Sequence, residues 1–333
     1  MRKLKEIILL FLMMTPAFFA SSCAPPKGAE YTAGGYSLNT YVSVTLYGCG
    51  SQRIADEAVK MCSYYEEIFS RTSETSRLYE LNEKGALDIE SGEDKLLADA
   101  VGLALQYGEM TDGALDITIE PLSSAWNFGT ASEVPEAGRL EAALKLVDYR
   151  RVELREGRIE LNGARVDLGA VAKGYIADRI KEYLIGEGVD SALIYLGGNV
   201  LCIGEKPDGG DFRIGLQRPF GEANDVMRVL SVSDLSVVTS GVYERFFYEN
   251  DKLYHHILDP ATGFPCDNGL LSVTVIAEDS VLCDALSTAC FVMGQDRAKR
   301  LVDGLEGVYA VFVDSGYNVI YSEGAEAFVK SQG

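Results

Sequence analysis

The sequence has 333 residues, of which 47% are hydrophobic and 24% are charged, and its formal net charge is −20. This balance is that of a globular protein, and it excludes a disordered acidic chain, a collagen and a polytopic membrane protein. The charge also argues against a nucleic-acid partner, because a polyphosphate needs a surface rich in Lys and Arg. A phosphorylated ligand would have to be held by backbone N–H groups, a few local cations or a metal ion.

The N-terminus has the layout of an export signal. Arg2, Lys3 and Lys5 precede an apolar run of 14 residues at 7–20, which is shorter than the ~20 residues that a membrane-spanning helix needs. The Ser-Ser-Cys that follows resembles a bacterial lipobox, in which Cys23 becomes the lipidated first residue of the mature protein. Ordinary cleavage without a lipid is the alternative.

The chain is therefore divided into three parts. Residues 1–22 are interpreted as a lipoprotein signal peptide, and residues 23–35, which contain several Pro and Gly, as a flexible tether. Residues 36–333 have no internal linker and are expected to form one domain. This organisation predicts an exported protein that is lipid-anchored at the periplasmic or other extracytoplasmic face of the cell membrane.

Helical and strand patterns alternate along the domain. Apolar residues at helical spacing predict helices over 52–69, 95–107, 172–185 and 280–293. Strands are predicted over 41–47, 151–154, 158–161, 191–203, 212–216, 226–232, 237–239, 245–248 and 270–276, with a final pair after Val308. Many sequential strands among few helices favour an α+β fold with largely antiparallel sheets and two intimately joined lobes.

Six cysteines follow Cys23, and none lies in a Cys-x-x-Cys or Cys/His pattern typical of a zinc or iron–sulfur site. Most have apolar neighbours and are interpreted as small core residues. A disulfide or two among them is compatible with export.

Five segments combine polar residues with glycine. They are TDGALDITIEPL at 111–122, DLGAVAKGYIAD at 167–178, LIYLGGN at 193–199, HHILDPATG at 255–263 and DALSTACFVMG at 284–294. Each alone is explained by a turn or a helix cap. Together, in this order, they resemble the ApbE family, the FAD:protein FMN transferases, over about residues 36–328.

The resemblance implies a T-fold-like enzyme that is exported, often lipid-anchored, and dependent on Mg2+. Its substrate would be FAD, from which it transfers the FMN moiety through a phosphoester to a Thr or Ser hydroxyl of an acceptor flavoprotein, with release of AMP. A subunit of a membrane redox complex is an acceptor of the kind expected. Attack on a diphosphate needs charge neutralisation, which fits a metal ion held by hard oxygen ligands.

Asp284 and Thr288 are the first candidate metal ligands. They are four residues apart in a predicted helix, so their side chains share one face. An isolated pair of this kind is usually only a solvated helix surface, and the other motifs favour the metal. By resemblance, Ala170 adds a backbone carbonyl, and Ser287 lies in the same shell.

Further residues correspond to positions that contact FAD in the family. By resemblance they are Leu38, Thr72, Ala114, Leu115, Asp116, Asp167, Lys173 and Leu258. Lys173 would meet a diphosphate or a flavin carbonyl as a point charge, although a surface lysine in the first turn of a helix is the alternative. Leu38 stands where the family commonly has Met, and Asn39 and Thr72 stand where it usually has Gly and an aromatic residue.

His256 is the candidate general base, because an imidazole near its working pH can take the proton of an acceptor hydroxyl. A histidine hydrogen-bonded in the core is the alternative for this position. Asp259 is expected to shape a turn. Two other activities compete with transfer: Mg2+-dependent FAD hydrolysis to FMN and AMP, which the departure at Asn39 keeps open, and flavin binding by a non-catalytic lipoprotein.

Overall fold

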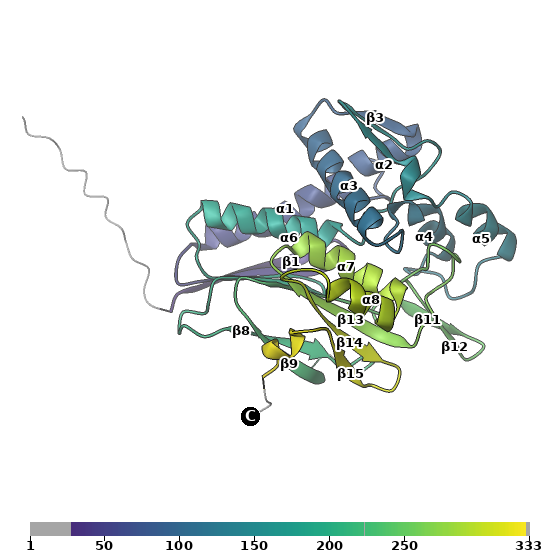
Figure 1. The fold of residues 1–333 in the computed structure, drawn as a ribbon. Coiled ribbons are helices and arrows are strands. Elements are labelled where there is room, and N and C mark those ends of the chain that lie inside the picture. Colours follow the sequence, from purple (N-terminus) through teal and green to yellow (C-terminus); the bar gives the residue numbers. More distant parts are fainter. Residues whose placement is uncertain (1–27, 223, 331–333) are drawn as a thin grey trace, which may run out of the picture.

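The structure is a computed structural model that describes residues 28–222 and 224–330 (Figure 1). The predicted signal peptide and Cys23 lie outside these residues. Within the described part of the chain, no helix has the length and apolar character needed to cross a membrane. All six cysteines from Cys49 to Cys290 are unpaired there, and four of them are buried, as expected for core residues.

An eight-stranded sheet organises the molecule, and every neighbouring pair in it is antiparallel. This confirms the predicted α+β class. The strands, in spatial order, are β1 (Glu30–Ser37), β2 (Thr40–Tyr47), β6 (Ala192–Leu196), β7 (Asn199–Ile203), β10 (Ser236–Gly241), β13 (Leu270–Ala277), β14 (Tyr309–Asp314) and β15 (Val319–Tyr321).

Both faces of the sheet are covered, because side chains alternate along each strand. Val238 and Phe312 pack in one cluster with α7 and α8, whereas Val237 and Val311 pack in another with β8 and β9. Figure 1 shows the helices above the sheet and the β8–β9 ribbon below it. The covering elements are α7 (Ser280–Met293), α8 (Gln295–Val302), β8 (Phe212–Gln217), β9 (Val226–Val232) and the short helix η3 (Ala325–Phe328).

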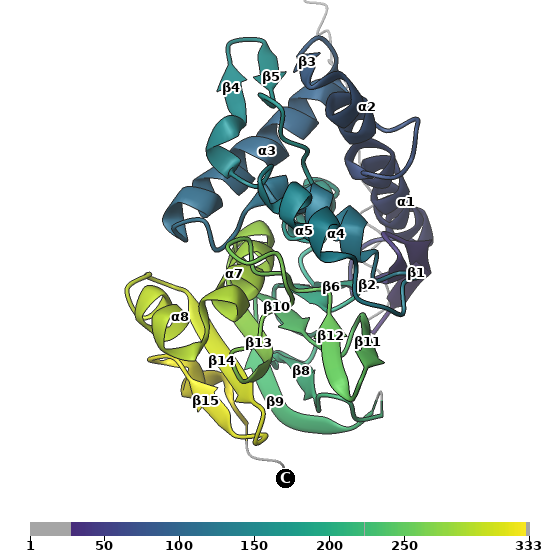
Figure 2. The same ribbon diagram turned by 90° about the vertical axis from the view of Figure 1, so that its right-hand side faces the viewer.

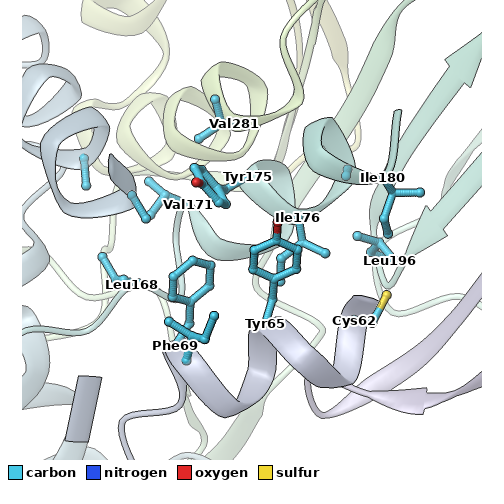
Figure 3. Packing of buried hydrophobic residues seen from close by; sticks show 14 of the residues in the cluster. Cys62, Tyr65, Phe69, Leu168, Val171, Tyr175, Ile176, Ile180, Leu196 and Val281 are labelled. Atoms are coloured by element: carbon cyan, nitrogen blue, oxygen red, sulfur yellow. The ribbon is translucent and has the colours of Figure 1, made fainter. Parts of the chain in front are cut away.

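Helices α1 (Gln52–Phe69) and α6 (Ala172–Gly186) cover the β1, β2 and β6 end of the sheet. Tyr175 of α6 meets Tyr65 and Phe69 of α1 edge to face, with ring centroids 6.0 and 5.5 Å away (Figure 3). Such pairs contribute about 0.5–1.5 kcal/mol each beyond their area burial. This packing holds α6, which carries the second polar motif, firmly against the sheet.

A second lobe of helices and a small sheet stands beside the main sheet (Figure 2). Its elements are α2 (Arg77–Lys84), α3 (Gly92–Met110), η1 (Ile117–Ile119), α4 (Glu120–Trp126), α5 (Ala137–Leu144), η2 (Tyr149–Arg151) and the strands β3 (Ala86–Asp88), β5 (Arg158–Glu160) and β4 (Glu153–Arg155). One hydrophobic cluster includes both Leu97 of α3 and Val44 of β2. The two lobes therefore share a core.

A hairpin of β11 (Phe246–Glu249) and β12 (Lys252–His255) is fastened to this second lobe by an aromatic stack. The ring of Trp126 lies 5.3 Å from that of Phe128 and 5.6 Å from that of Tyr254. The buried Trp126 indole also donates a hydrogen bond to Gly263 O at 2.8 Å. The loop that follows the two histidines is thereby positioned by residues more than a hundred positions earlier in the chain.

Two sequence predictions need correction. The single strand predicted over 191–203 is the hairpin β6–β7, because Gly197 and Gly198 take left-handed backbone angles, φ 52° and 80°, in a two-residue turn. The predicted tether ends earlier than residue 35, because residues 30–37 form β1 and pair along their whole length with β2. Hydrogen bonding to β2 keeps these residues extended, although Gly34 and Gly35 by themselves favour a flexible chain.

Helices α6 and α7 approach each other closely. A Cβ at Gly174 would be only 2.4 Å from Ser280 O, so only glycine allows this approach. Asp178 of α6 accepts hydrogen bonds from the backbone N–H groups of Ser280 (2.9 Å) and Val281 (2.8 Å), and so caps α7. Burial raises the pKa of Asp178 to about 6, and the carboxylate is ionised at neutral pH.

We expect Asp178→Ala to lower the free energy of unfolding by about 2 kcal/mol, because two N–H groups at the start of α7 lose their acceptor. Urea denaturation at pH 7.5 measures the change. Asp279→Ala is the matched control: Asp279 is the N-cap residue of α7, yet its side chain makes no capping hydrogen bond. Equal stability of the two variants would contradict the capping role.

Candidate active site

Two of the predicted motifs meet at the α6–α7 contact. The buried Asp284 of α7 accepts a hydrogen bond at Oδ2 from Gly174 N (2.9 Å), and its Oδ1 lies 3.4 Å from Lys173 Nζ. The candidate metal ligand and the candidate phosphate-binding lysine, 111 residues apart in the chain, are therefore adjacent. Because Lys173 stands in the first turn of α6, its charge adds to the positive end of that helix.

The hydroxyl groups of α7 lie one turn beyond Asp284. Ser240 Oγ of β10 is 3.2 Å from Thr288 Oγ1 and 2.8 Å from Ser287 Oγ. Ser287 is fully buried and its hydroxyl donates to Asp284 O (2.9 Å). Ser287 is thus engaged by protein groups, whereas Thr288 is only half-buried.

The loop before α6 supplies the third predicted donor. The first helical hydrogen bond of α6 runs from Tyr175 N to Val171 O, which leaves the Ala170 carbonyl outside the helix. Among the described residues no hydrogen bond to this oxygen is found. A carboxylate, a hydroxyl and a carbonyl are hard oxygen donors, so Asp284, Thr288 and Ala170 fit the preferences of Mg2+.

Such a site would depend on mixed donors. In residues 28–222 and 224–330 there is no group of three or more His, Cys, Asp and Glu side chains that could hold a metal ion. One carboxylate leaves coordination positions to water and substrate phosphate, which is how Mg2+ is commonly bound in phosphoryl-transfer enzymes.

The two histidines have different environments. His255 is buried, with Nε2 2.9 Å from Cys266 O, and its Nδ1 accepts a hydrogen bond from Ile257 N (3.3 Å). These contacts place the proton on Nε2 and engage both ring nitrogens. The His255 ring also packs against Phe291. We assign His255 a structural role.

His256 follows directly after β12 and is half-buried. Its backbone N–H donates to Arg245 O (3.1 Å), but its buried Nδ1 has no hydrogen-bond partner in the described structure. Burial lowers the pKa of His256 well below its usual value, and the positive charges of Arg245 and Lys173 lower it further. The imidazole is therefore neutral at pH 7, which is the form that accepts a proton.

Glu244 belongs to the same cluster, and the sequence did not single it out. Part of the Glu244 side chain is exposed to solvent, but the protein atoms around its carboxyl remove water from it and so raise its pKa. The positive charges of Lys173 and Arg245 oppose this increase. A Cβ at Gly198 would be 3.2 Å from Glu244 Oε1. Glu244 is therefore close to the Gly197–Gly198 turn and also interacts with Lys173 and Arg245, the two cations that act on His256.

A second missed residue, Arg71, holds Asp167 in place. Its Nε lies 3.1 Å from Asp167 Oδ2, and its Nη1 donates to Ser124 Oγ (3.0 Å). Asp167 also accepts from Gly169 N (2.9 Å) within its own loop. Thr72, the neighbour of Arg71, is exposed. Asp167 and Thr72 are therefore brought into one neighbourhood, which only the fold could reveal.

Other predicted contact residues have structural tasks. The buried Asp116 accepts hydrogen bonds from Thr118 N (2.7 Å) and Tyr149 N (2.9 Å), so its carboxylate folds its own segment. Burial raises the pKa of Asp116. Ala114 and Leu115 are buried in the main core. The backbone N–H groups of Ala114 and Leu115 both donate to Thr111.

Leu258 is buried against Leu122 and Trp126 of α4 in the second lobe. As predicted, the adjacent Asp259 shapes the turn: its Oδ1 accepts from Ala261 N at 2.8 Å, and its carbonyl accepts from Gly263 N at 2.8 Å.

Leu38 and Asn39 form the two-residue turn between β1 and β2, with φ of 55° and 57°. A leucine in this left-handed region is strained by roughly 1–2 kcal/mol. Thr40, which follows, lies against the β6–β7 turn, since a Cβ at Gly197 would be 2.2 Å from Thr40 Oγ1. The two turns therefore lie side by side at the end of the sheet where Glu244 is found.

Known structures share this architecture. The structure of the ApbE protein from Thermotoga maritima matches with a TM-score of 0.83 and 32% identity, over 91% of this chain and 100% of that one. The fold also matches that of the flavinyl transferase ApbE from Pseudomonas stutzeri, with a TM-score of 0.80 and 24% identity, over 92% and 98% of the two chains.

Sequence comparison agrees. The model of the ApbE family matches residues 38–312. The FAD:protein FMN transferase of Treponema pallidum is 34% identical over 313 residues, covering 85% of this chain and 84% of that protein. The enzyme of that name from Klebsiella pneumoniae is 33% identical over 297 residues, covering 88% and 92%. This chain belongs to the ApbE family.

Proposed function

We propose that this protein is a Mg2+-dependent FAD:protein FMN transferase. It takes the FMN moiety of FAD, attaches it through a phosphoester to a Thr or Ser hydroxyl of an acceptor flavoprotein, and releases AMP. The observation that carries the proposal is the contact of Lys173 with Asp284 at 3.4 Å, together with a buried His256 Nδ1 that has no hydrogen-bond partner among the described residues. Relatives named for this reaction, covering most of the chain, support it.

Each group has a task in this reaction. The acceptor oxygen forms a bond to the FMN phosphorus while the bond from that phosphorus to the bridging oxygen breaks, and AMP leaves with the bridging oxygen. The hydroxyl proton passes to the imidazole of His256, and Lys173 offsets diphosphate charge as a point cation. Asp284, Thr288 and Ala170 O would hold Mg2+, which neutralises the phosphate oxygens when bound.

The segments that we propose to hold FAD come from both lobes. They carry Leu38, Thr72, Ala114, Leu115, Asp116, Asp167 and Leu258, of which Ala114 to Asp116 would act through their backbone. Arg71 is a positioning residue for Asp167, and Ser287 for the helix face that carries Asp284 and Thr288.

FAD hydrolysis is the second candidate, because water can take the place of the acceptor hydroxyl at the same site. The left-handed turn at Leu38–Asn39, which departs from the family pattern at Asn39, is the observation that favours it. One experiment separates the candidates: the purified protein is incubated with FAD, Mg2+ and an acceptor domain, and the acceptor mass is read. Covalent FMN supports transfer, free FMN with AMP supports hydrolysis, and intact FAD supports binding alone.

We expect Asp284→Ala to abolish Mg2+-dependent turnover, because Asp284 supplies the only full negative charge among the proposed ligands. Asp284→Asn controls for loss of the helix contact, because its amide oxygen can still accept the N–H of Gly174. This variant should fold like wild type and be as inactive as Asp284→Ala. AMP release as a function of Mg2+ concentration is the measurement. Near wild-type activity of either variant would exclude this metal site.

His256→Asn should keep FAD and Mg2+ affinity near wild type and slow FMN transfer by about 10²–10⁴-fold, the usual contribution of a positioned base. Because its pKa is depressed, His256 loses its base form only as the pH falls well below 6.5. The wild-type rate should therefore decline only in that acid range, and the residual rate of the variant should not follow it.

His255→Asn serves as the comparison, since both nitrogens of that ring are engaged by the backbone. This substitution should lower the melting temperature and should have a smaller effect on the transfer rate per folded protein. Equal losses of specific activity in both variants would assign the pair a common structural role and would remove His256 as the base.

We also propose that the protein is anchored to the extracytoplasmic face of the membrane by a lipid on Cys23. Because β1 begins at Glu30, the seven steps between these residues span at most ~25 Å. The catalytic domain would then stay near the bilayer, where a subunit of a membrane redox complex is within reach. Cys23→Ala should abolish lipid-dependent processing and move the protein to the soluble fraction. Unchanged processing and membrane retention would contradict the anchor.

A further inference from the structure

An exposed group of aromatic side chains lies beside the hairpin that carries the histidines. It consists of Phe246 and Tyr248 of β11, Phe220 in the loop after β8, and Tyr317 in the turn between β14 and β15; we call these four residues the aromatic strip. Their exposed fractions are 38%, 59%, 40% and 39%. A contiguous group of large exposed apolar side chains is typical of an interaction site.

The strip is one surface although separate segments supply it. The ring centroids of Phe220 and Phe246 are 5.4 Å apart, and those of Phe246 and Tyr248 are 5.8 Å apart. Tyr317 is joined to the same loop, because its hydroxyl donates to Pro219 O at 3.4 Å. The contacts run without interruption from the β14–β15 turn to β11.

Two members of the strip are held in an unfavourable backbone conformation. Phe220 and Tyr317 have φ of 59° and 60°. For bulky L residues this costs roughly 1–2 kcal/mol each. Both residues leave about 40% of their surface exposed, so burial offsets only part of this cost. Strain of this kind is commonly found where a surface binds a ligand.

The strip adjoins the end of the hairpin that carries both histidines. Phe246 is the cross-strand partner of His255, and the carbonyl of Arg245 accepts the His256 N–H at 3.1 Å. The Arg245 side chain is exposed, and no ion pair to it occurs among the described residues. At the other side, Arg218 lies over the Tyr317 ring and pairs with Asp225. Arg218 is thus neutralised by Asp225, whereas Arg245 offers a positive charge beside the strip on a chain whose net charge is −20.

We propose that the aromatic strip is the docking surface for the acceptor polypeptide. The acceptor lies along the strip as an extended segment. One of its apolar side chains packs against Phe220 and Phe246, and one of its carboxylates lies near Arg245. This rests on the proposed transfer reaction, which requires a stretch of polypeptide next to His256. The strands β11 and β12 form a two-stranded sheet, so each has an outer edge that no other described strand pairs with. An extended segment can add its backbone hydrogen bonds to such an edge.

The test uses variants that preserve the local backbone. Phe220→Asn removes the ring and places a residue that tolerates positive φ, and Tyr248→Thr keeps a residue suited to a strand. Tyr64→Gln is the matched control, because Tyr64 is 42% exposed on α1, outside the strip. The probes are short fluorescein-labelled peptides with a central threonine, flanked by Leu and Asp, by Leu and Lys, or by Ser and Gly only.

Fluorescence anisotropy should show the Leu/Asp peptide binding wild type at least tenfold more tightly than the other two. Each strip variant should lose about tenfold of that affinity, the size of one aromatic contact, and Tyr64→Gln should lose none. Equal binding of the three peptides, no binding of any of them, or equal effects of the strip variants and the control would overturn the proposal.

FMN transfer to the Leu/Asp peptide and AMP release from FAD are measured on the same proteins. If wild type releases AMP but modifies no peptide, while binding remains dependent on the strip, the transferase proposal fails and the docking surface stands. If transfer proceeds and the strip variants leave both peptide affinity and the KM for peptide unchanged, the docking surface fails alone. AMP release without peptide should be the same in all strip variants.

Discussion

The candidate site depends on the contact between the N-terminal halves of α6 and α7. Gly174 allows the two backbones to approach, Asp178 of α6 accepts the N–H groups that open α7, and Asp284 of α7 accepts the N–H of Gly174 in return. The exchange satisfies backbone groups that a buried helix start would otherwise leave unpaired. Its consequence is that the Asp284 carboxylate, the Lys173 ammonium and the Ala170 loop come to one place.

Placement of positive charge is the second requirement, since the chain as a whole carries −20. An anionic dinucleotide would be repelled by most of such a surface and can approach only where cations are concentrated. Lys173 and Arg245 are both close enough to His256 to lower its pKa, and both act on Glu244. In the proposed reaction the same two cations would attract phosphate while keeping the imidazole neutral, so that binding and base catalysis would be compatible in one small region.

The paired histidines have different environments, which suit one to a structural task and the other to the proposed chemical task. His255 closes hydrogen bonds with the backbone of Cys266 and Ile257, which fixes the end of β12. His256 then has its backbone fixed by Arg245 O while its ring keeps an unengaged nitrogen. The stack on Trp126 secures the same hairpin from the side of the second lobe. If His256 is the base, as we propose, its ring needs little rearrangement before it can act.

The sequence alone determined the α+β class, the long elements such as 52–69 and 280–293, and the family, because long amphipathic periods and ordered motifs are local properties. It did not reveal α2, α4, α5 and α8, since helices of seven or eight residues contain too few turns to show a period. It predicted Lys173, His256, Asp284 and Thr288 as site residues, but the adjacency of Lys173 and Asp284, the partnership of Arg71 with Asp167 and the presence of Glu244 near Lys173 were decided by the tertiary structure. The structural tasks of Asp116 and His255, and the strand at 30–35, were decided there too. The physical reason is the same in each case: a hydrogen bond, an ion pair or a strand pairing between segments far apart in the chain leaves no periodic signal in either of them.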